Sequence, residues 1–194
     1  MRKGHDGVLF CGLGQGIVFA LLAVFFIIGV GCSSDGKLEE GLTLSLLKNC
    51  TYRVGTSTVR LQEGSLTVGQ SINDYFYVGL ADAALGDLNG DGKNDGAVIL
   101  KNSGGGSGMF YELTAMLCEA GGKDSGAGRG GLRQTNSIEL GDRVEILTLL
   151  LMRGRIIMEM KAHGPDDPSC CPSVKVKRFY ILRDGELVET AGDT

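Results

Sequence analysis

Residues 143–162 read RVEILTLLLMRGRIIMEMKA, and this stretch decides the fold class. Two apolar runs, 143–152 and 156–162, lie on either side of the turn sequence RGR. Short apolar runs joined by a few residues that include Gly are typical of a β-hairpin, and the connection is too short for a crossover helix. Because the first run is apolar at almost every position, we expect both of its faces to be covered by other parts of the protein.

The same pattern recurs along the chain from residue 51 onward. Asp184-Gly185 marks a second tight turn, between expected strands 174–182 and 186–190. Consecutive hairpins of this kind predict an all-β domain, mainly an antiparallel meander, with a sandwich or barrel-like arrangement. The remaining expected strands cover residues 52–54, 57–61, 75–80, 96–101, 109–119 and 137–140.

The composition excludes several classes of protein. The 194 residues carry 19 Lys plus Arg and 23 Asp plus Glu, a formal net charge of −4. This balance lacks the basic character typical of nucleic-acid binding, so no nucleic-acid partner is expected. The 32 glycines have no three-residue period and 43% of the residues are hydrophobic, which argues against a collagen-like or disordered chain. The length fits a single folded domain.

The N-terminus has the features of an export signal. Arg2 and Lys3 precede an apolar run over residues 17–30, and Cys32 follows that run after a single glycine. A basic start, an apolar stretch and small residues before a cleavage point are typical of a secretory signal peptide. The placement of the cysteine resembles the lipobox of bacterial lipoproteins, which implies cleavage before Cys32 and acylation of its thiol and of the new amine. An uncleaved membrane helix over residues 8–30 and simple secretion remain open as alternatives.

The expected anchor determines the expected organisation. Residues 1–31 form the lipoprotein signal peptide, residues 32–48 the lipidated cysteine and a polar tether with a short helix over 38–47, and residues 49–194 a single β-rich exported domain. Two or three acyl chains, at about 0.8 kcal/mol per buried methylene group, give stable attachment to a membrane. We therefore expect a lipid-anchored protein of the bacterial cell envelope that faces the periplasm or the surface. By resemblance to enterobacterial sorting, Ser33 favours the outer membrane.

Residues 85–98, LGDLNGDGKNDGAV, contain the strongest motif. Oxygen-bearing side chains recur at alternate positions, and a glycine follows the third of them. Ca²⁺ prefers six to eight oxygen ligands, and Gly permits the sharp turn that lets them face a common centre. Because Val98 occupies the twelfth position, where an EF-hand has a carboxylate, Asp95 is expected to supply the bidentate contact. The alternative is a metal-free turn rich in Asp and Asn. The expected ligands are the side chains of Asp87, Asn89, Asp91 and Asp95 and the backbone carbonyl of Lys93.

The D-x-N-x-D-G-x-x-D spacing resembles the calcium loops of integrin-type FG-GAP repeats and of dockerins. FG-GAP loops join two strands, and the expected strands on either side of this loop favour that comparison over the helical dockerins. A single copy excludes a propeller built from such repeats. A wider resemblance, to uncharacterised bacterial envelope lipoproteins that share a GDLNGDG core and a GPDDP-x-CCP segment, implies an architecture and no activity. It covers residues 84–100, 104–117, 141–160 and 163–174.

The remaining cysteines and one histidine suggest further chemistry. An exported chain favours oxidation of its cysteines. The adjacent pair can close a vicinal ring or reach the two distant cysteines separately, and a thiol-redox sensor at this pair is one alternative function. Another is an exported hydrolase that uses His163 with Asp166 or Asp167. The candidates for disulfides are Cys50, Cys118, Cys170 and Cys171.

The preferred function is that of a membrane-anchored exported lipoprotein with a calcium-stabilised β-domain. It is expected to be noncatalytic and to serve binding or envelope structure, with an envelope protein or a glycan as its partner. Calcium is the one expected cofactor.

Overall fold

The computed structural model describes residues 41–71, 74–120 and 130–192, all within one unit that spans residues 35–194. The expected signal peptide and the lipidation site Cys32 lie outside the described residues. Within the described part of the chain, no helix has the length and apolar character needed to cross a bilayer.

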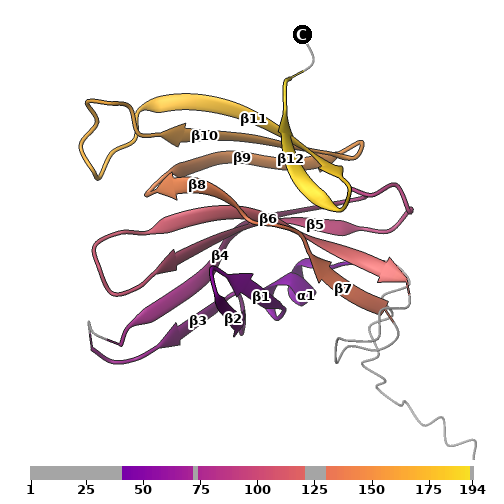
Figure 1. Ribbon diagram of the computed structural model, residues 1–194, viewed down its shortest axis with the longest axis horizontal. Helices are drawn as coiled ribbons and strands as arrows, with labels where there is room; N and C mark the ends of the chain where they lie inside the picture. The colour runs from indigo at the N-terminus through magenta and orange to yellow at the C-terminus, as the bar shows by residue number, and fades with distance from the viewer. Residues whose placement is uncertain (1–40, 72–73, 121–129, 193–194) are drawn as a thin grey trace, which may run out of the picture. The chain divides into compact units, whose positions relative to one another are not determined.

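The described residues form one short helix and a series of β-strands, so the all-β expectation is confirmed (Figure 1). Every strand expected from the sequence is present, β12 with the expected ends and the others with shifted ends, and β3 and β7 were not expected. The elements in chain order are α1 (Leu44–Lys48), β1 (Thr51–Val54), β2 (Ser57–Arg60), β3 (Ser65–Val68), β4 (Phe76–Gly86), β5 (Asp95–Ser103), β6 (Phe110–Ala120), β7 (Gly130–Gln134), β8 (Ile138–Asp142), β9 (Glu145–Met152), β10 (Arg155–Ala162), β11 (Val174–Arg183) and β12 (Glu186–Thr190).

The strands form two antiparallel meanders and a separate hairpin. One sheet has the order β12-β11-β10-β9, and the other has the order β3-β4-β5-β6-β7 with β8 paired to the first part of β6. Both turns predicted from the sequence are present: Arg153-Gly154 and Asp184-Gly185 have positive φ at both residues and join strands that pair directly. Because residues with positive φ match the twist of the flanking strands, these two sequences fix the hairpin registers.

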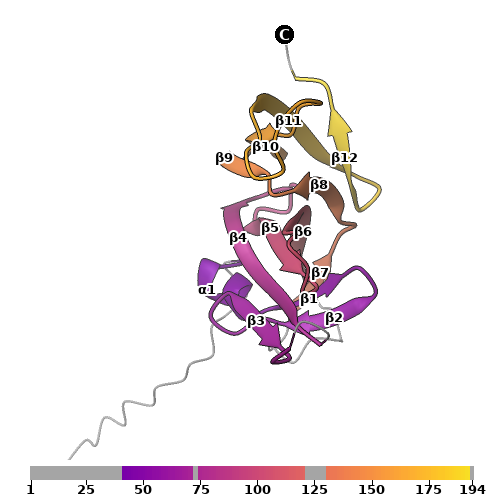
Figure 2. The same cartoon turned by 90° about the vertical axis from the view of Figure 1, so that its left-hand side faces the viewer.

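The larger sheet is covered on both faces. Its upper face packs on the four-stranded sheet, and its lower face packs on α1 and the β1–β2 hairpin (Figures 1 and 2). We call the apolar cluster between the two sheets the upper core, and the cluster between the larger sheet and α1 with the β1–β2 hairpin the lower core. The first six residues of β5 are all buried, with Ala97 and Ile99 in the upper core and Val98 and Leu100 in the lower core. Alternate residues of a strand point to opposite faces, so β5 is enclosed by apolar layers on both sides. β6 is enclosed in the same way, with Leu113 and Leu117 on the upper side and Met116 on the lower side.

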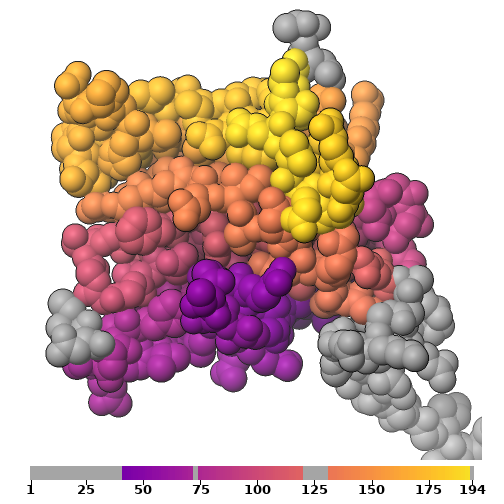
Figure 3. All heavy atoms as spheres, viewed as in Figure 1, coloured from indigo at the N-terminus to yellow at the C-terminus, as the bar shows by residue number. Residues whose placement is uncertain are grey.

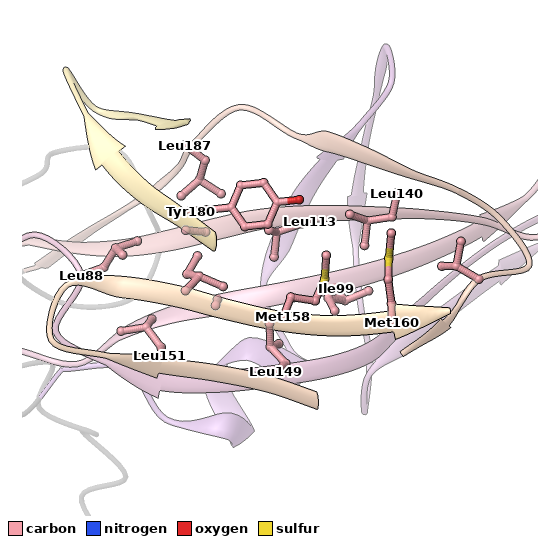
Figure 4. Packing of buried hydrophobic residues seen from close by; sticks show 14 of the residues in the cluster. Leu88, Ile99, Leu113, Leu140, Leu149, Leu151, Met158, Met160, Tyr180 and Leu187 are labelled. Carbon is pink, nitrogen blue, oxygen red and sulfur yellow. The ribbon is translucent and has the colours of Figure 1, made fainter. Parts of the chain in front are cut away.

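The upper core is the main contact between the two sheets. Met158 and Tyr180 from the four-stranded sheet meet Ile99 and Leu113 from the larger sheet, and Leu187 of β12 closes one side (Figure 4). All five side chains are at most 3% exposed. Burial of a large apolar side chain contributes about 1.5–3 kcal/mol, so this cluster is a principal source of the fold's stability.

The structure corrects the expectation that both faces of the strand over residues 143–152 are covered. β9 alternates between buried and exposed positions: Leu149 and Leu151 are each 8% exposed, whereas Leu150 and Met152 are 46% and 50% exposed. β9 is an edge strand, and one of its faces packs on the upper core while the other faces outward. The apolar run therefore has only one covered face.

The structure also moves the start of the folded domain toward the N-terminus. Residues 32–48 were expected to be tether, but Leu42 and Leu47 are 1% and 0% exposed and belong to the lower core. The helix is shorter than the expected span over residues 38–47, and the Thr43 hydroxyl caps it by accepting a hydrogen bond from the Leu46 N–H at 3.2 Å. In the space-filling view, indigo atoms from the N-terminal part of the described chain lie on the side of the domain away from the yellow C-terminal strands (Figure 3).

Candidate metal centre

The loop predicted to bind calcium joins β4 to β5. The two strands pair up to Gly86 and Asp95, so the loop is the end of a hairpin. Leu88 is 4% exposed and packs in the upper core, which fixes the loop to the body of the sheet. The Leu42 N–H donates to the Asn94 carbonyl at 2.7 Å and holds the loop from the other side.

Asp87 organises the first half of the loop. Its Oδ1 accepts a hydrogen bond from the Gly90 N–H at 2.6 Å, and its Oδ2 accepts one from the Gly92 N–H at 2.9 Å. Gly90 and Gly92 have φ values of +83° and +82°, a conformation that residues with a β-carbon rarely adopt. The two glycines therefore let the backbone curl so that its N–H groups face one carboxylate.

Asn89 and Asp91 continue the same pattern on the exposed side of the loop. The Asp91 N–H donates to Asn89 Oδ1 and the Lys93 N–H donates to Asp91 Oδ1, each at 2.9 Å. The Asn89 amide also donates to Asp91 Oδ2 at 3.3 Å. These are Asx turns, in which a side-chain oxygen accepts the N–H two residues later.

Asp95 differs from the other loop residues because it is fully buried. Its Oδ1 accepts the Cys118 N–H at 2.8 Å, and its Oδ2 accepts the Leu88 and Asn89 N–H groups at 3.0 and 3.3 Å. Burial raises the pKa of this carboxyl group, against the lowering effect of the three N–H donors, and the charge of Asp91 raises it further. Asp95 thus ties the loop to β6.

A cation in this loop could bind only to the acceptor positions that the hydrogen bonds leave unoccupied. A carboxylate has about four acceptor positions, and Asp87 and Asp91 each use two of them, whereas Asp95 uses three. In this arrangement Asp95 has no room for the bidentate contact that the sequence suggested. Nor does the structure gather three or more His, Cys, Asp or Glu side chains into a group able to hold a metal anywhere in the described ranges.

A hollow of about 610 Å³ lies beside the loop. It is lined by residues 86–90 from the loop side and by residues 151–154 from the β9–β10 turn. At its edge the two sheets approach closely, because a β-carbon at Gly86 would lie 2.8 Å from the Leu151 carbonyl oxygen. Asp87 and Asn89 therefore face a surface depression rather than the core.

Sequence reasoning missed the contacts that position this loop. Leu88 lies between two predicted ligands, and its apolar character was the available signal that the loop has a buried side. The contact of Asp95 with Cys118 depends on the pairing of β5 with β6, 23 residues apart, and no local pattern indicates it.

The cysteines take one of the arrangements that the sequence left open. Cys170 and Cys171 form a disulfide with each other, and Cys50 and Cys118 remain as buried thiols. Burial raises the pKa of both thiols. Cys170 and Cys171 are exposed, so the bridge lies on the surface, whereas the two thiols lie in the interior.

One residue of the alternative hydrolase site, Asp167, is engaged by hydrogen bonds within its own loop. Both oxygens of Asp167 accept hydrogen bonds, from the Gly164 N–H, the Ser173 N–H and the Ser173 hydroxyl. These bonds lower the pKa of Asp167, and the charge of His163 lowers it further. Asp166 is exposed. Asp167 thus acts in the structure as an acceptor that shapes its own loop.

Comparisons of this chain with protein-family models, with curated proteins and with solved structures find no match.

Proposed function

We propose that this protein is an exported lipoprotein, held on a membrane by acylated Cys32, whose β-domain is stabilised by Ca²⁺ in the loop over residues 87–95. Its role is noncatalytic and serves binding or the structure of the bacterial envelope. The observation that carries the calcium assignment is the concentration of hard oxygen donors in this loop, where three aspartates and two asparagines occur within nine residues and Lys93 is the one cation.

Several of these oxygens have acceptor positions left for a cation. Asp87 and Asp91 each keep about two, and Asn89 Oδ1 accepts one N–H and keeps another. Oxygen donors of this kind suit Ca²⁺ better than softer metals. The backbone carbonyl of Lys93 completes the proposed set, and Asp95 contributes at most one oxygen while it secures the loop to β6.

Binding in this loop would stabilise the fold because the loop is tied to both cores. Leu88 packs in the upper core, and Asn94 bonds Leu42, which packs in the lower core. At a tenfold excess of Ca²⁺ over a dissociation constant of about 10⁻⁴ M, typical of extracellular modules, linkage adds about 1.4 kcal/mol to the free energy of unfolding.

The calcium assignment is tested by thermal melting of the full chain in mild detergent. With 1 mM Ca²⁺ in place of EGTA we expect the midpoint to rise by about 3–6 °C. The Asp91→Ala variant should lose most of this rise. Asp166→Ala removes an exposed carboxylate in the β10–β11 loop and should keep it. Equal midpoints of the unsubstituted protein in Ca²⁺ and in EGTA would refute the assignment.

The anchor is tested separately by mass spectrometry of the protein purified from its native membranes. We expect the N-terminal peptide to begin at Cys32 and to carry acyl chains. Cys32→Ser should remain unprocessed by the lipoprotein route. A full-length, unacylated N-terminus in the soluble fraction would contradict the anchor and leave the calcium experiment unaffected.

A further inference from the structure

We infer that the Cys170–Cys171 bridge is a surface redox site, which exchanges two electrons with a dithiol while the β-domain stays folded. The inference does not depend on the calcium loop. It rests on where the bridge lies, on what else holds its loop in place, and on the length of chain that the bridge encloses.

The bridge lies in the loop between β10 and β11. The pairing of these strands ends at Ala162 and Val174, and both cysteines are exposed in the loop beyond that pair. Attack by a thiolate requires access to a sulfur atom, so exposure of both residues permits the reaction in the folded state.

The loop is held without help from the bridge. Asp167 Oδ2 accepts the Gly164 N–H at 2.8 Å and the Ser173 N–H at 2.7 Å, and its Oδ1 accepts the Ser173 hydroxyl at 2.7 Å. One carboxylate thus joins the two ends of the loop. The Cys171 N–H donates to the Pro168 carbonyl at 3.0 Å and adds a turn inside it. When the S–S bond opens, these hydrogen bonds still fix where the loop begins and ends.

The bridge also restrains very little of the chain. A disulfide stabilises a fold mainly by closing a loop in the unfolded chain, and its effect grows with the length of that loop. Cys170 and Cys171 are consecutive, so their bridge encloses no intervening residue. Opening it should change the local backbone and leave the stability of the sheets nearly unchanged.

The other two cysteines do not compete for the bridge in the folded state. Cys50 and Cys118 are 8% and 0% exposed, and this burial keeps their sulfur atoms out of reach of the bridge and of an external thiolate. The vicinal pair therefore reacts with an external dithiol rather than with the protein's own thiols.

The exchange balances without any further reactant. One thiolate of the dithiol attacks a sulfur of the bridge, and the S–S bond breaks to give a mixed disulfide and one free thiolate on the protein. The second thiolate of the donor attacks the mixed disulfide and releases the other cysteine. Two electrons and two protons pass to Cys170 and Cys171, which become thiols, and the donor becomes a disulfide.

The test uses the full chain in mild detergent, purified without reductant, with dithiothreitol as the dithiol. Before reduction, an alkylating reagent should label neither Cys170 nor Cys171, and their peptide should lack two hydrogen atoms. After reduction of the folded protein both should be labelled together, while Cys50 and Cys118 stay unlabelled. The rate of reduction should lie within about tenfold of the rate in denaturant.

Thermal melting supplies a second readout. The reduced protein and the double variant Cys170→Ser/Cys171→Ser should both melt within about 2 °C of the oxidised protein. The single variant Cys170→Ser should leave Cys171 open to labelling without reductant. The inference is overturned by a linked peptide that joins either cysteine to Cys50 or Cys118, by labelling before reduction, by reduction only in denaturant, or by a large fall in the midpoint of the double variant.

Discussion

Asp95 shows how one buried carboxylate can hold a loop to a sheet. An unpaired N–H left in a buried place costs about 1–3 kcal/mol. Asp95→Asn replaces one acceptor oxygen by an amide that only donates, so at least one of the Cys118, Leu88 and Asn89 N–H groups loses its partner. We expect the free energy of unfolding to fall by about 1–3 kcal/mol in denaturant titrations with EGTA present.

Asp91→Asn is the matched control for this substitution. Asp91 is exposed, and an asparagine oxygen at this position still accepts the Lys93 N–H. In EGTA its stability should stay within about 0.5 kcal/mol of the unsubstituted protein. Equal losses at both positions would mean that Asp95 has no special role in joining the loop to β6.

Glu112 makes stability depend on pH. It is 7% exposed on β6, and its Oε1 receives no hydrogen bond. Burial raises its pKa above the ordinary value of 4.5; a hydrogen bond from Ser137 lowers the pKa, and the charge of Glu139, paired with it on β8, raises it. A carboxyl group with a raised pKa binds more protons in the folded than in the unfolded state, so stability falls as pH rises from about 4.5 through the raised pKa.

Glu112→Gln should remove this loss, because the amide cannot ionise. We expect the variant to exceed the unsubstituted protein in stability by on the order of 1 kcal/mol at pH 8 and to match it more closely at pH 4. Denaturant titrations across this range measure the difference. Glu139→Gln, at the exposed partner, should give a smaller pH-dependent gain. Parallel curves for Glu112→Gln and the unsubstituted protein would refute the assignment.

β9 shows that an apolar sequence does not by itself indicate how many faces of a strand are covered. Leu150 and Leu151 are neighbours with exposed fractions of 46% and 8%. Leu151→Ala should cost about 2–5 kcal/mol, and Leu150→Ala less than about 1 kcal/mol, in denaturant titrations. Similar losses for the two variants would show that the outward face of β9 is covered.

Local pattern predicted most of the strands, and the exceptions have identifiable causes. β7 begins at Gly130 within a glycine-rich stretch, and β3 is a four-residue edge strand, so neither has a long apolar run. The hairpin turns were predictable because Asp184-Gly185 and Arg153-Gly154 each have a glycine where positive φ is needed. Each of these turn signals lies within two or three consecutive residues, so it can be recognised from the sequence alone.

Burial was harder to predict because it depends on which sheet lies opposite. The strands enclosed on both faces are β5 and β6, whereas the sequence of β9 suggested that role. Leu42 and Leu47 were assigned to a tether because a polar segment precedes them, and their place under the larger sheet depends on strands far along the chain. The oxygen-bearing residues of the metal loop could be identified locally, whereas the core-facing contact of Asp95 could not.

Across the whole domain, the packing of the two sheets depends on a close approach at Gly86. A β-carbon there would lie 2.8 Å from both the carbonyl oxygen and the Cδ2 atom of Leu151. Gly86→Ala should therefore push β4 away from β9 and cost about 1–3 kcal/mol. Gly104 has no atom within 4 Å of the added carbon, so Gly104→Ala should change stability by less than about 0.5 kcal/mol. Chemical denaturation of both variants makes the comparison.

The contact of the first described residues with Asn94 has a mechanical consequence. Gly41 forms an isolated β-bridge with Asn94, and the Leu42 N–H donates a hydrogen bond to the Asn94 carbonyl. Tension applied through the N-terminal end therefore enters the domain at the turn between β4 and β5. In single-molecule pulling from that end, we expect the first rupture to peel Leu42 and α1 from this turn before the sheets separate. A divalent ion that stiffened the turn would then raise the force of that first event and leave the later ones unchanged.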